Sequence, residues 1–264
     1  MASRIASELS YYLVSTYYNV KSFFTYRAQA WMWVIQALIS LLFSLVGVTI
    51  IYSISSGITG WSYYQLLFLT YLMSLTFGIA VFLSNPWDLP QALRTGQFDS
   101  LMTRPFSVLN LSFVNSRAVS ALISTVAGST VFLAYISLQL RLSLPLIAAF
   151  LPLYLMGVAA LVMFLEVLAV LSYKLMKSGN FINQAMNAMG TLSNYPLSVY
   201  GNAVQLFFTL FVPIGIAGYY PLQVLLGNVT PELYAFLFAL SAVFIFVFHR
   251  LFNRLMRSYE SGGG

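Results

Sequence analysis

The feature that most constrains the fold is a series of long apolar stretches with almost no charge. The first runs from Trp31 to Tyr52 and contains no charged side chain. A helix needs ~20 apolar residues to cross the hydrocarbon core of a bilayer. The apolar runs are continuous and lack the alternating pattern of an outer-membrane barrel, so we predict helical spans. Besides 31–52, the clear candidates are 63–83, 118–140, 145–171 and 231–252.

Composition supports a membrane protein and argues against several other classes. Charged residues make up 7% of the chain, against about 25% in a typical soluble domain. The net charge of +6 does not indicate nucleic-acid binding, because the basic residues are scattered singly. The absence of cysteine excludes disulfides, thiolate metal sites and thiol catalysis.

The sequence contains no recognisable catalytic, cofactor-binding or metal-binding motif. None of the three lysines, Lys21, Lys174 and Lys177, follows a glycine, so the phosphate-binding loop of an ATPase is missing. His249 is the only histidine and stands beside Arg250 near the end of the last predicted span. We therefore predict that the chain is not an enzyme.

The distribution of basic residues predicts the orientation of the spans. Loops on the cytoplasmic side carry an excess of Lys and Arg. With a cytoplasmic N-terminus, only Arg141 lies outside. Both termini are then cytoplasmic, and residues 259–264 form a tail. The cytoplasmic basic residues are Arg4, Lys21, Arg27, Arg94, Arg104, Arg117, Lys174, Lys177, Arg250, Arg254 and Arg257.

Residues 1–30 predict an amphipathic helix instead of a span. Apolar and aromatic side chains recur at helical spacing from Leu9 to Phe24, and Ser15, Asn19 and Ser22 fall on the other side. This pattern is typical of a helix that lies in the plane of the lipid headgroups. The alternative is a cytoplasmic helix that packs on the ends of the spans.

The loop 84–117 carries more charge than the other connections and predicts local helix. Asp88 is a candidate N-cap with Gln91 three residues on, as in a capping box, and Gly96 supplies the stop. A second turn is expected from Gln97 to Thr103, with Asp99 at its start. Such a loop suits docking to a cytoplasmic partner, but the residues alone are equally consistent with an ordinary connector.

The region from Ser178 to Pro231 admits two topologies. Hydropathy alone selects 204–220 as the fifth span, although this stretch contains Pro213, Gly215 and Gly218. The preceding stretch 181–197 is uncharged and rich in Asn. If both are embedded, one crosses and the other re-enters and leaves on the same side, which gives six spans in either case.

Uncharged polar residues form a stripe on the helix predicted in 181–197. They repeat every three or four residues and therefore share one helix face. The stripe either lines a translocation path or forms hydrogen bonds across a helix interface. Its members are Asn180, Asn183, Gln184, Asn187, Thr191 and Asn194.

Two further features lie inside predicted spans. Glu166 is the one acid in the interior of a span, where a charge costs roughly 2.5–3.5 kcal/mol. It either reaches water, pairs with Lys174 or a basic residue of the N-terminal helix, or takes part in transport. Small residues in 118–140 predict close helix packing. They form two ladders, Ser120, Ser124, Gly128 and Ala121, Thr125, Ser129.

The stretch from Gly96 to Pro105, Gly-Gln-Phe-Asp-Ser-Leu-Met-Thr-Arg-Pro, resembles the cytoplasmic loop motif of ABC type-2 permeases. The similarity is to the six-span branch of uncharacterised permease components. Three later motifs resemble that family's segment after the fifth span, and the order of the motifs extends the resemblance over nearly the whole chain. They are Asn194-Tyr195-Pro196, Phe211-Val212-Pro213 and Tyr219-Tyr220-Pro221.

The resemblance implies an all-α integral membrane fold with six transmembrane helices in a single domain, 31–258. Residues 1–30 would be an interfacial elbow helix, 84–117 would hold a cytoplasmic coupling helix, 181–197 would span, and 200–222 would re-enter as a gate. The implied ATPase-coupling residues are Asp88, Arg94, Gly96, Phe98, Asp99, Arg104 and Pro105. The possible translocation path is Asn183, Gln184, Asn187, Asn194 and Glu166. The implied gate is Pro213, Gly215, Tyr219, Tyr220 and Pro221.

The resemblance also implies a function, namely the permease subunit of an exporter in a prokaryotic cytoplasmic membrane. ATP and Mg would bind a separate ATP-binding-cassette ATPase, and a second permease chain, identical or homologous, would complete the pore. A wall with almost no fixed charge suits a hydrophobic or amphipathic substrate moved by alternating access. One alternative is an ion-coupled secondary transporter, which usually needs more intramembrane ionisable groups than Glu166 alone. The other is a non-transporting membrane scaffold.

Overall fold

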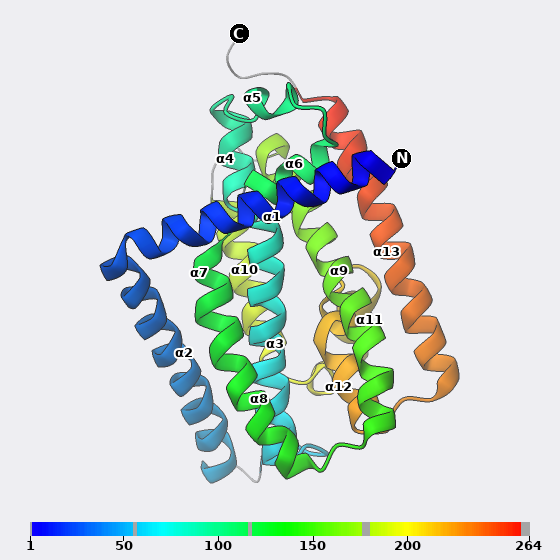
Figure 1. The fold of residues 1–264 in the computed structure, drawn as a ribbon. Helices are drawn as coiled ribbons and strands as arrows, with labels where there is room; N and C mark the ends of the chain where they lie inside the picture. Colours follow the sequence, from blue (N-terminus) through cyan, green and yellow to red (C-terminus); the bar gives the residue numbers. More distant parts are fainter. Residues whose placement is uncertain (1, 55–56, 116–117, 176–179, 260–264) are drawn as a thin grey trace.

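The computed structural model describes residues 2–54, 57–115, 118–175 and 180–259, and within these ranges it contains helices and no strands (Figure 1). Four segments are long and apolar enough to cross a membrane. They are α2 (Arg27–Ile54), the stretch Tyr63–Arg94 that contains α3 (Tyr63–Ser84), α9 (Leu144–Leu175) and α13 (Pro231–Arg257). A bent pair of helices brings the number to five if it crosses as one span. The protein is therefore an all-α integral membrane protein.

The N-terminal helix α1 (Ala2–Thr25) lies across one end of the upright helices (Figure 1). Tyr12 Oη donates a hydrogen bond of 3.1 Å to Asn110 Oδ1, which fixes one side of α1 to the protein. Ser15 and Asn19 share this half-buried side, whereas Leu13 and Tyr17 are exposed. The contacts of Tyr12 show that α1 packs on the protein, while its exposed apolar side chains remain available to the headgroup layer, so the position of α1 in that layer stays a prediction.

The region 118–140 forms one continuous helical run with a π-helical turn, and we call it the third helical run. It consists of α7 (Val119–Ala121), the π turn η1 (Leu122–Val126) and α8 (Ala127–Leu140). A Cβ added at Gly78 of α3 would overlap Thr125 Oγ1, and one added at Gly128 would overlap Leu41 Cδ1 of α2. Small residues therefore allow close approach of these helices. The predictions that fall on Arg117, Lys177 and the side chain of Ser124 lie outside the described residues.

Helices α9 and α13 pack against each other along their length. Both run from the end opposite α5 (Asp99–Met102) toward it (Figure 1). Leu153 and Ala160 of α9 meet Leu237 and Phe244 of α13 in one buried cluster. Nearer to α5, α9 and α13 contribute to a second cluster, which also includes residues of α4 (Asp88–Arg94). The largest buried cluster lies on the other side of α9, where α9 meets α3, α8 and the second arm of the bent pair described below.

The region after α9 differs from the straight span that hydropathy alone selects. Helix α10 (Asn180–Ser193) has 14 residues, and at 1.5 Å per residue it is shorter than the ~30 Å hydrocarbon core. It ends before Pro196, which disfavours helical backbone in the preceding residue. The stretch 204–220 is not one straight helix, because α11 (Asn202–Leu210) and the following helix Gly215–Leu225 are bent by 85°. Pro213 lies at the bend, and it lacks the amide hydrogen that a continuous helix requires. Whether 181–197 or 204–220 forms the fifth span stays a prediction.

That following helix comprises the π turn η3 (Gly215–Tyr219) and α12 (Tyr220–Leu225). The bent pair lies in the half of the molecule away from α5 (Figure 1). Its second arm packs on α9 and α3. The expected total of six spans, with 181–197 crossing and 200–222 re-entering, stays a prediction.

Candidate functional site

The candidate site begins with the segment 85–107, which connects α3 to α6 (Val108–Asn115) and contains α4 and α5. Its apolar side chains are buried against the spans. Leu93 and Phe98 are fully buried in a cluster with Val170 of α9 and Phe252 of α13. Burial of one such side chain contributes about 1.5–3 kcal/mol. The segment is therefore packed firmly on α9 and α13.

The start of α4 is not the capping box that the sequence suggests. Helix α4 begins at Asp88, and its N-cap, Trp87, makes no side-chain capping bond. Asn85 takes a left-handed conformation with φ 34° and its Nδ2 donates to Asp88 Oδ2 at 2.6 Å. Asp88 is thus the first residue of α4 and not its N-cap, so the capping role predicted for Asp88 and Gln91 is wrong. Gly96 has φ 70° just after α4, which fits its predicted role as a helix stop.

Two of the predicted coupling residues, Asp99 and Arg104, contact residues of the N-terminal helix α1 and of the segment after α13. Tyr259 Oη lies 2.9 Å from Asp99 Oδ1 and 3.1 Å from the Leu93 carbonyl oxygen, so its one proton is shared between them. Burial, with Asp99 beside it, raises the pKa of Tyr259 to about 12. Arg104 Nη1 donates to Tyr11 Oη of α1, and its guanidinium lies 5.5 Å from the centre of the Tyr11 ring. Asp99 and Arg104 thus attach the segment to α13 and α1.

Other residues of the segment face outward. Among the predicted coupling residues, Phe98 is buried, Gly96 is half-buried, and Asp88, Arg94 and Pro105 are exposed. We define the exposed face of the segment by its outward side chains between Gln91 and Met102. Its members are Gln91, Arg94, Thr95, Gln97, Ser100 and Met102.

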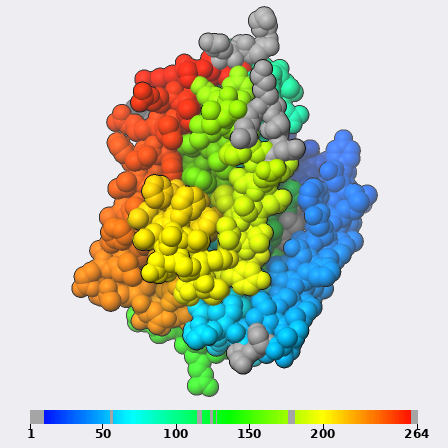
Figure 2. Space-filling view, turned by 180° about the vertical axis from the view of Figure 1, so that it is seen from behind, coloured from blue at the N-terminus to red at the C-terminus, as the bar shows by residue number. Residues whose placement is uncertain are grey.

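The polar stripe on α10 is exposed in the single chain. Asn183, Gln184, Asn187 and Asn194 are exposed, whereas Ile182 and Met189 on the other side of α10 are buried. Figure 2 shows the region of α10 to α12, in yellow, at the surface between α2 and α13. The stripe therefore lies on an open face of the molecule.

Trp87 joins the segment 85–107 to the polar stripe. Its Nε1 donates a hydrogen bond of 2.7 Å to Asn183 Oδ1. Trp87 was not among the residues predicted from the sequence, because the two partners are 96 residues apart and no local pattern pairs them. The sequence feature that could have indicated this contact is the position of aromatic Trp87 shortly after the span α3.

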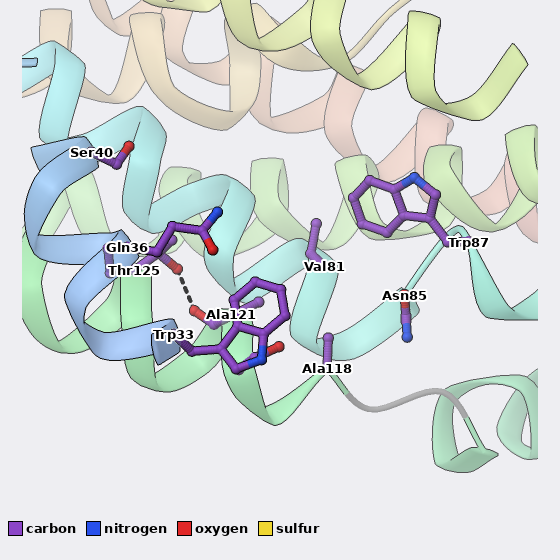
Figure 3. A pocket seen from close by; sticks show the side chains of 11 residues that line it. Trp33, Gln36, Ser40, Val81, Asn85, Trp87, Ala118, Ala121 and Thr125 are labelled. Carbon is purple, nitrogen blue, oxygen red and sulfur yellow. Dashed lines mark hydrogen bonds between the residues drawn. The ribbon is translucent and has the colours of Figure 1, made fainter. Parts of the chain in front are cut away.

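A cavity of about 470 Å³ lies beside α2, between Trp87 and the third helical run (Figure 3). Trp33 and Trp87 supply aromatic surface, and Gln36 and Asn85 supply amides. A second cavity, of about 400 Å³, shares Ser40 with the first and is lined by Asn194. Apolar walls with a few polar groups are typical of sites for small amphipathic molecules. Both cavities lie along α2, and the second reaches Asn194, the last residue of the polar stripe; we call the two neighbouring cavities together the groove along α2.

Glu166 is separate from the polar stripe. Its side chain is fully buried, and Ser112 Oγ of α6 donates a hydrogen bond of 2.6 Å to Glu166 Oε2. Glu166 Oε1 has no hydrogen-bond partner among the described residues. Lys174 instead donates to the carbonyl oxygen of Ser258 at 3.2 Å. The expectations that Glu166 reaches water or pairs with Lys174 are therefore wrong, because α6 covers it.

The predicted gate residues are packed inside the protein. Pro213, Gly215, Tyr219 and Pro221 are buried, and Tyr220 is half-buried with its hydroxyl 3.2 Å from Thr209 Oγ1. A Cβ at Gly157 of α9 would overlap the carbonyl oxygen of Ile216. The second arm of the bent pair is thus held tightly against α9.

These features define a class of protein: a polytopic α-helical membrane protein with a helix across one end and an ordered polar segment beside it. The chain belongs to the ABC-2 family of transporter proteins, since the family model described as ABC-2 family transporter protein matches residues 38–263. No curated protein and no solved structure matches the chain. Family membership supports a permease role in an ABC transporter, with an ABC ATPase as partner. Permeases of this family are typically non-catalytic membrane subunits.

Proposed function

We propose that this chain is the transmembrane subunit of an ATP-driven exporter, and that a separate ATPase docks on the exposed face of the segment 85–107. ATP and Mg would bind only the ATPase. The assignment of export, and of a prokaryotic cytoplasmic membrane, rests on the family resemblance. The scarcity of charge in the spans favours a hydrophobic or amphipathic substrate.

The observation that carries this proposal is the hydrogen bond from Trp87 to Asn183. It connects the start of α4 directly with the polar stripe on α10. The buried cluster around Leu93 and Phe98 connects the same segment with α9 and α13. A displacement of α4 and α5 by a closing ATPase would therefore move both the core helices and the stripe, as alternating access requires.

The polar stripe supports a second permease chain. Exposed amides cannot face lipid tails without a cost of several kcal/mol per unsatisfied group. The exposed stripe of Asn183, Gln184 and Asn187 must therefore face another chain or water. We propose that two permease chains enclose a polar path between their α10 helices, and that the groove along α2 admits the substrate. The buried arm around Tyr219 would close this path on the outer side.

Affinity capture from native membranes tests the docking face. An Arg94→Glu/Gln97→Glu variant reverses the charge at position 94 and adds a negative charge at position 97, both on exposed side chains. We expect it to retain less ATP-binding-cassette ATPase than the wild type by a factor of about ten, the loss of one good interface contact. Arg141→Glu, at the opposite end of the molecule, is the matched control. Equal capture by both variants, or a wild-type preparation without any ATPase, contradicts the proposal.

One observation favours a second candidate function, ion-coupled secondary transport. Glu166 is a buried acid with an unpartnered carboxylate oxygen, and intramembrane acids often belong to proton or ion pathways. The position of Glu166 under α6, away from the exposed stripe, argues against this role. Substitution of Glu166 separates the two candidates, as described below.

A further inference from the structure

A broad groove lies at the end of α13 that is nearest to α5, and it shares only Met102 with the exposed face of the segment 85–107. It has a volume of about 1080 Å³ and opens between α13, α5 and α6. Arg250, Arg254 and Arg257 line one wall, and Met102 of α5 and Val108 of α6 line another. No Asp or Glu is among the described residues that line it.

The three arginines share one face of α13. Their spacing of four and three residues places them in a single row along the helix. All three are exposed. The guanidinium of Arg250 lies 5.1 Å from the centre of the Phe246 ring, a cation–π contact that does not neutralise its charge. The groove therefore presents three positive charges in a row to a bound group.

The same face of α13 continues as an apolar stripe. Val243 and Val247 precede Arg250 at the same helical spacing, and together with Phe246 they are exposed. These residues belong to the apolar helix Pro231–Arg257, and only 22% of its most apolar stretch is buried inside the chain. The face thus changes from apolar to cationic at Arg250, which is where a span passes from hydrocarbon to headgroups.

We propose that this groove binds an anionic phospholipid. Its phosphate would lie against Arg250, Arg254 and Arg257, and its acyl chains would lie along Val243, Phe246 and Val247. Basic pockets between helices on the cytoplasmic side of a membrane bind anionic headgroups. The continuous apolar stripe favours a lipid over a soluble phosphate or an acidic loop of the ATPase, because only a lipid fills both parts of the face. This proposal is independent of the proposed transport function.

A lipid in this groove would also contact the segment 85–107. Met102 lies on the exposed face that we assign to the ATPase, and Tyr259 holds Asp99. The bound lipid would therefore brace α5 against α13. We expect anionic lipid to stabilise the chain more than zwitterionic lipid does.

The test uses the full chain in neutral detergent, with thermal unfolding measured after addition of phosphatidylglycerol or phosphatidylcholine. At about ten times its Kd, phosphatidylglycerol should raise the Tm of the wild type by about 3–6 °C, and phosphatidylcholine should not. The variant Arg250→Gln/Arg254→Gln/Arg257→Gln should lose this rise, and the Lys variant of the same three positions should keep it. The matched control, Lys21→Gln/Arg27→Gln/Arg141→Gln, removes three exposed charges elsewhere and should respond like the wild type.

Three results would overturn the proposal. The first is an equal response to phosphatidylglycerol and phosphatidylcholine, or an unchanged response in the Gln variant of the groove. The second is an equal rise with inorganic phosphate alone, which would assign the groove to a free anion. The third is a groove variant that keeps its lipid response but loses ATPase capture, which would assign the arginines to the ATPase.

Discussion

At the residue scale, the charged side chains of Asp99 and Arg104 make contacts within the chain, so they stabilise the fold whether or not they contact an ATPase. Asp99 accepts from Tyr259, and Arg104 binds Tyr11. Loss of either side chain would loosen the segment 85–107 even if neither touches the ATPase. For that reason, exposed Arg94 is a better probe of docking than Asp99 or Arg104.

Glu166→Gln tests whether the buried acid is used in transport. The Gln side-chain oxygen can still accept the hydrogen bond from Ser112, and the substitution removes a buried ionisable group. We expect unchanged thermal stability within about 1 kcal/mol and unchanged ATP-dependent transport. Glu166→Ala leaves Ser112 Oγ without its partner and should cost about 1–3 kcal/mol, measured by thermal unfolding. A well-folded Gln variant that has lost transport would support ion coupling instead.

Tyr259→Phe tests the attachment of α13 to the segment 85–107. The pKa of Tyr259 is raised in the folded protein to about 12, above the ordinary value of about 10. The neutral phenol is thus favoured by folding, and its stabilising effect is complete below pH ~10 and lost as pH rises toward 12. The Tm difference between wild type and Tyr259→Phe should be constant from pH 7 to 9 and shrink above pH 10. A difference that does not change with pH, or one matched by exposed Tyr195→Phe, would contradict this role.

At the element scale, close packing between α3 and the third helical run depends on glycine. A Cβ at Gly78 would overlap Thr125 Oγ1, while one at Gly47 of α2 would meet nothing within 4 Å. The two positions are both helical glycines, so they have similar intrinsic helix propensity. They differ only in what surrounds them.

Gly78→Ala should destabilise the protein by about 1–3 kcal/mol, because the added methyl overpacks the contact with η1. Gly47→Ala is the matched control and should be neutral or slightly stabilising, since alanine favours helix. Thr125→Ala should recover part of the loss when combined with Gly78→Ala. Thermal unfolding of these three variants and the wild type measures these effects. Equal effects at Gly78 and Gly47 would contradict the packing described here.

The elements that could be predicted from the sequence are those fixed by local composition. The apolar run from Trp31 and the glycine stop at Gly96 depend on nearby residues alone. The start of α4 was predicted wrongly because the left-handed conformation of Asn85 and its bond to Asp88 depend on where α3 ends. The partners of Glu166 and Trp87 were missed because Ser112 and Asn183 reach them only through the tertiary fold. Hydropathy selected 204–220 as a straight span because it does not register that Pro213 interrupts helical hydrogen bonding.

At the scale of the whole molecule, α2 and α13 lie on opposite flanks, and the open face with α10 lies between them (Figures 1 and 2). This arrangement separates the proposed functions of the surface. In these proposals, the flank of α13 would meet lipid, the end with α4 and α5 would meet the ATPase, and the face of α10 would meet a second permease chain.

Disulfide cross-linking tests the second chain, because the protein has no cysteine of its own. If two identical chains pair through their stripes, Asn187→Cys should form a cross-linked dimer in native membranes on mild oxidation. Val131→Cys, exposed on α8, should remain mainly monomeric. Cross-links at Val131 but not at Asn187 would place the second chain elsewhere. Cross-links at neither position would indicate a non-identical partner, which the mass of an affinity-captured complex then reveals.

The most direct test of the central claim is site-specific photo-cross-linking in native membranes. A photoreactive amino acid replaces exposed Gln97 in the segment 85–107, and a matched probe replaces exposed Leu138 at the far end of α8. Our account predicts a cross-link from position 97 to an ATP-binding-cassette ATPase, with a yield that changes when ATP is added, and none from position 138. An absence of any ATPase adduct at 97, in membranes where the protein is folded and active, would contradict the account.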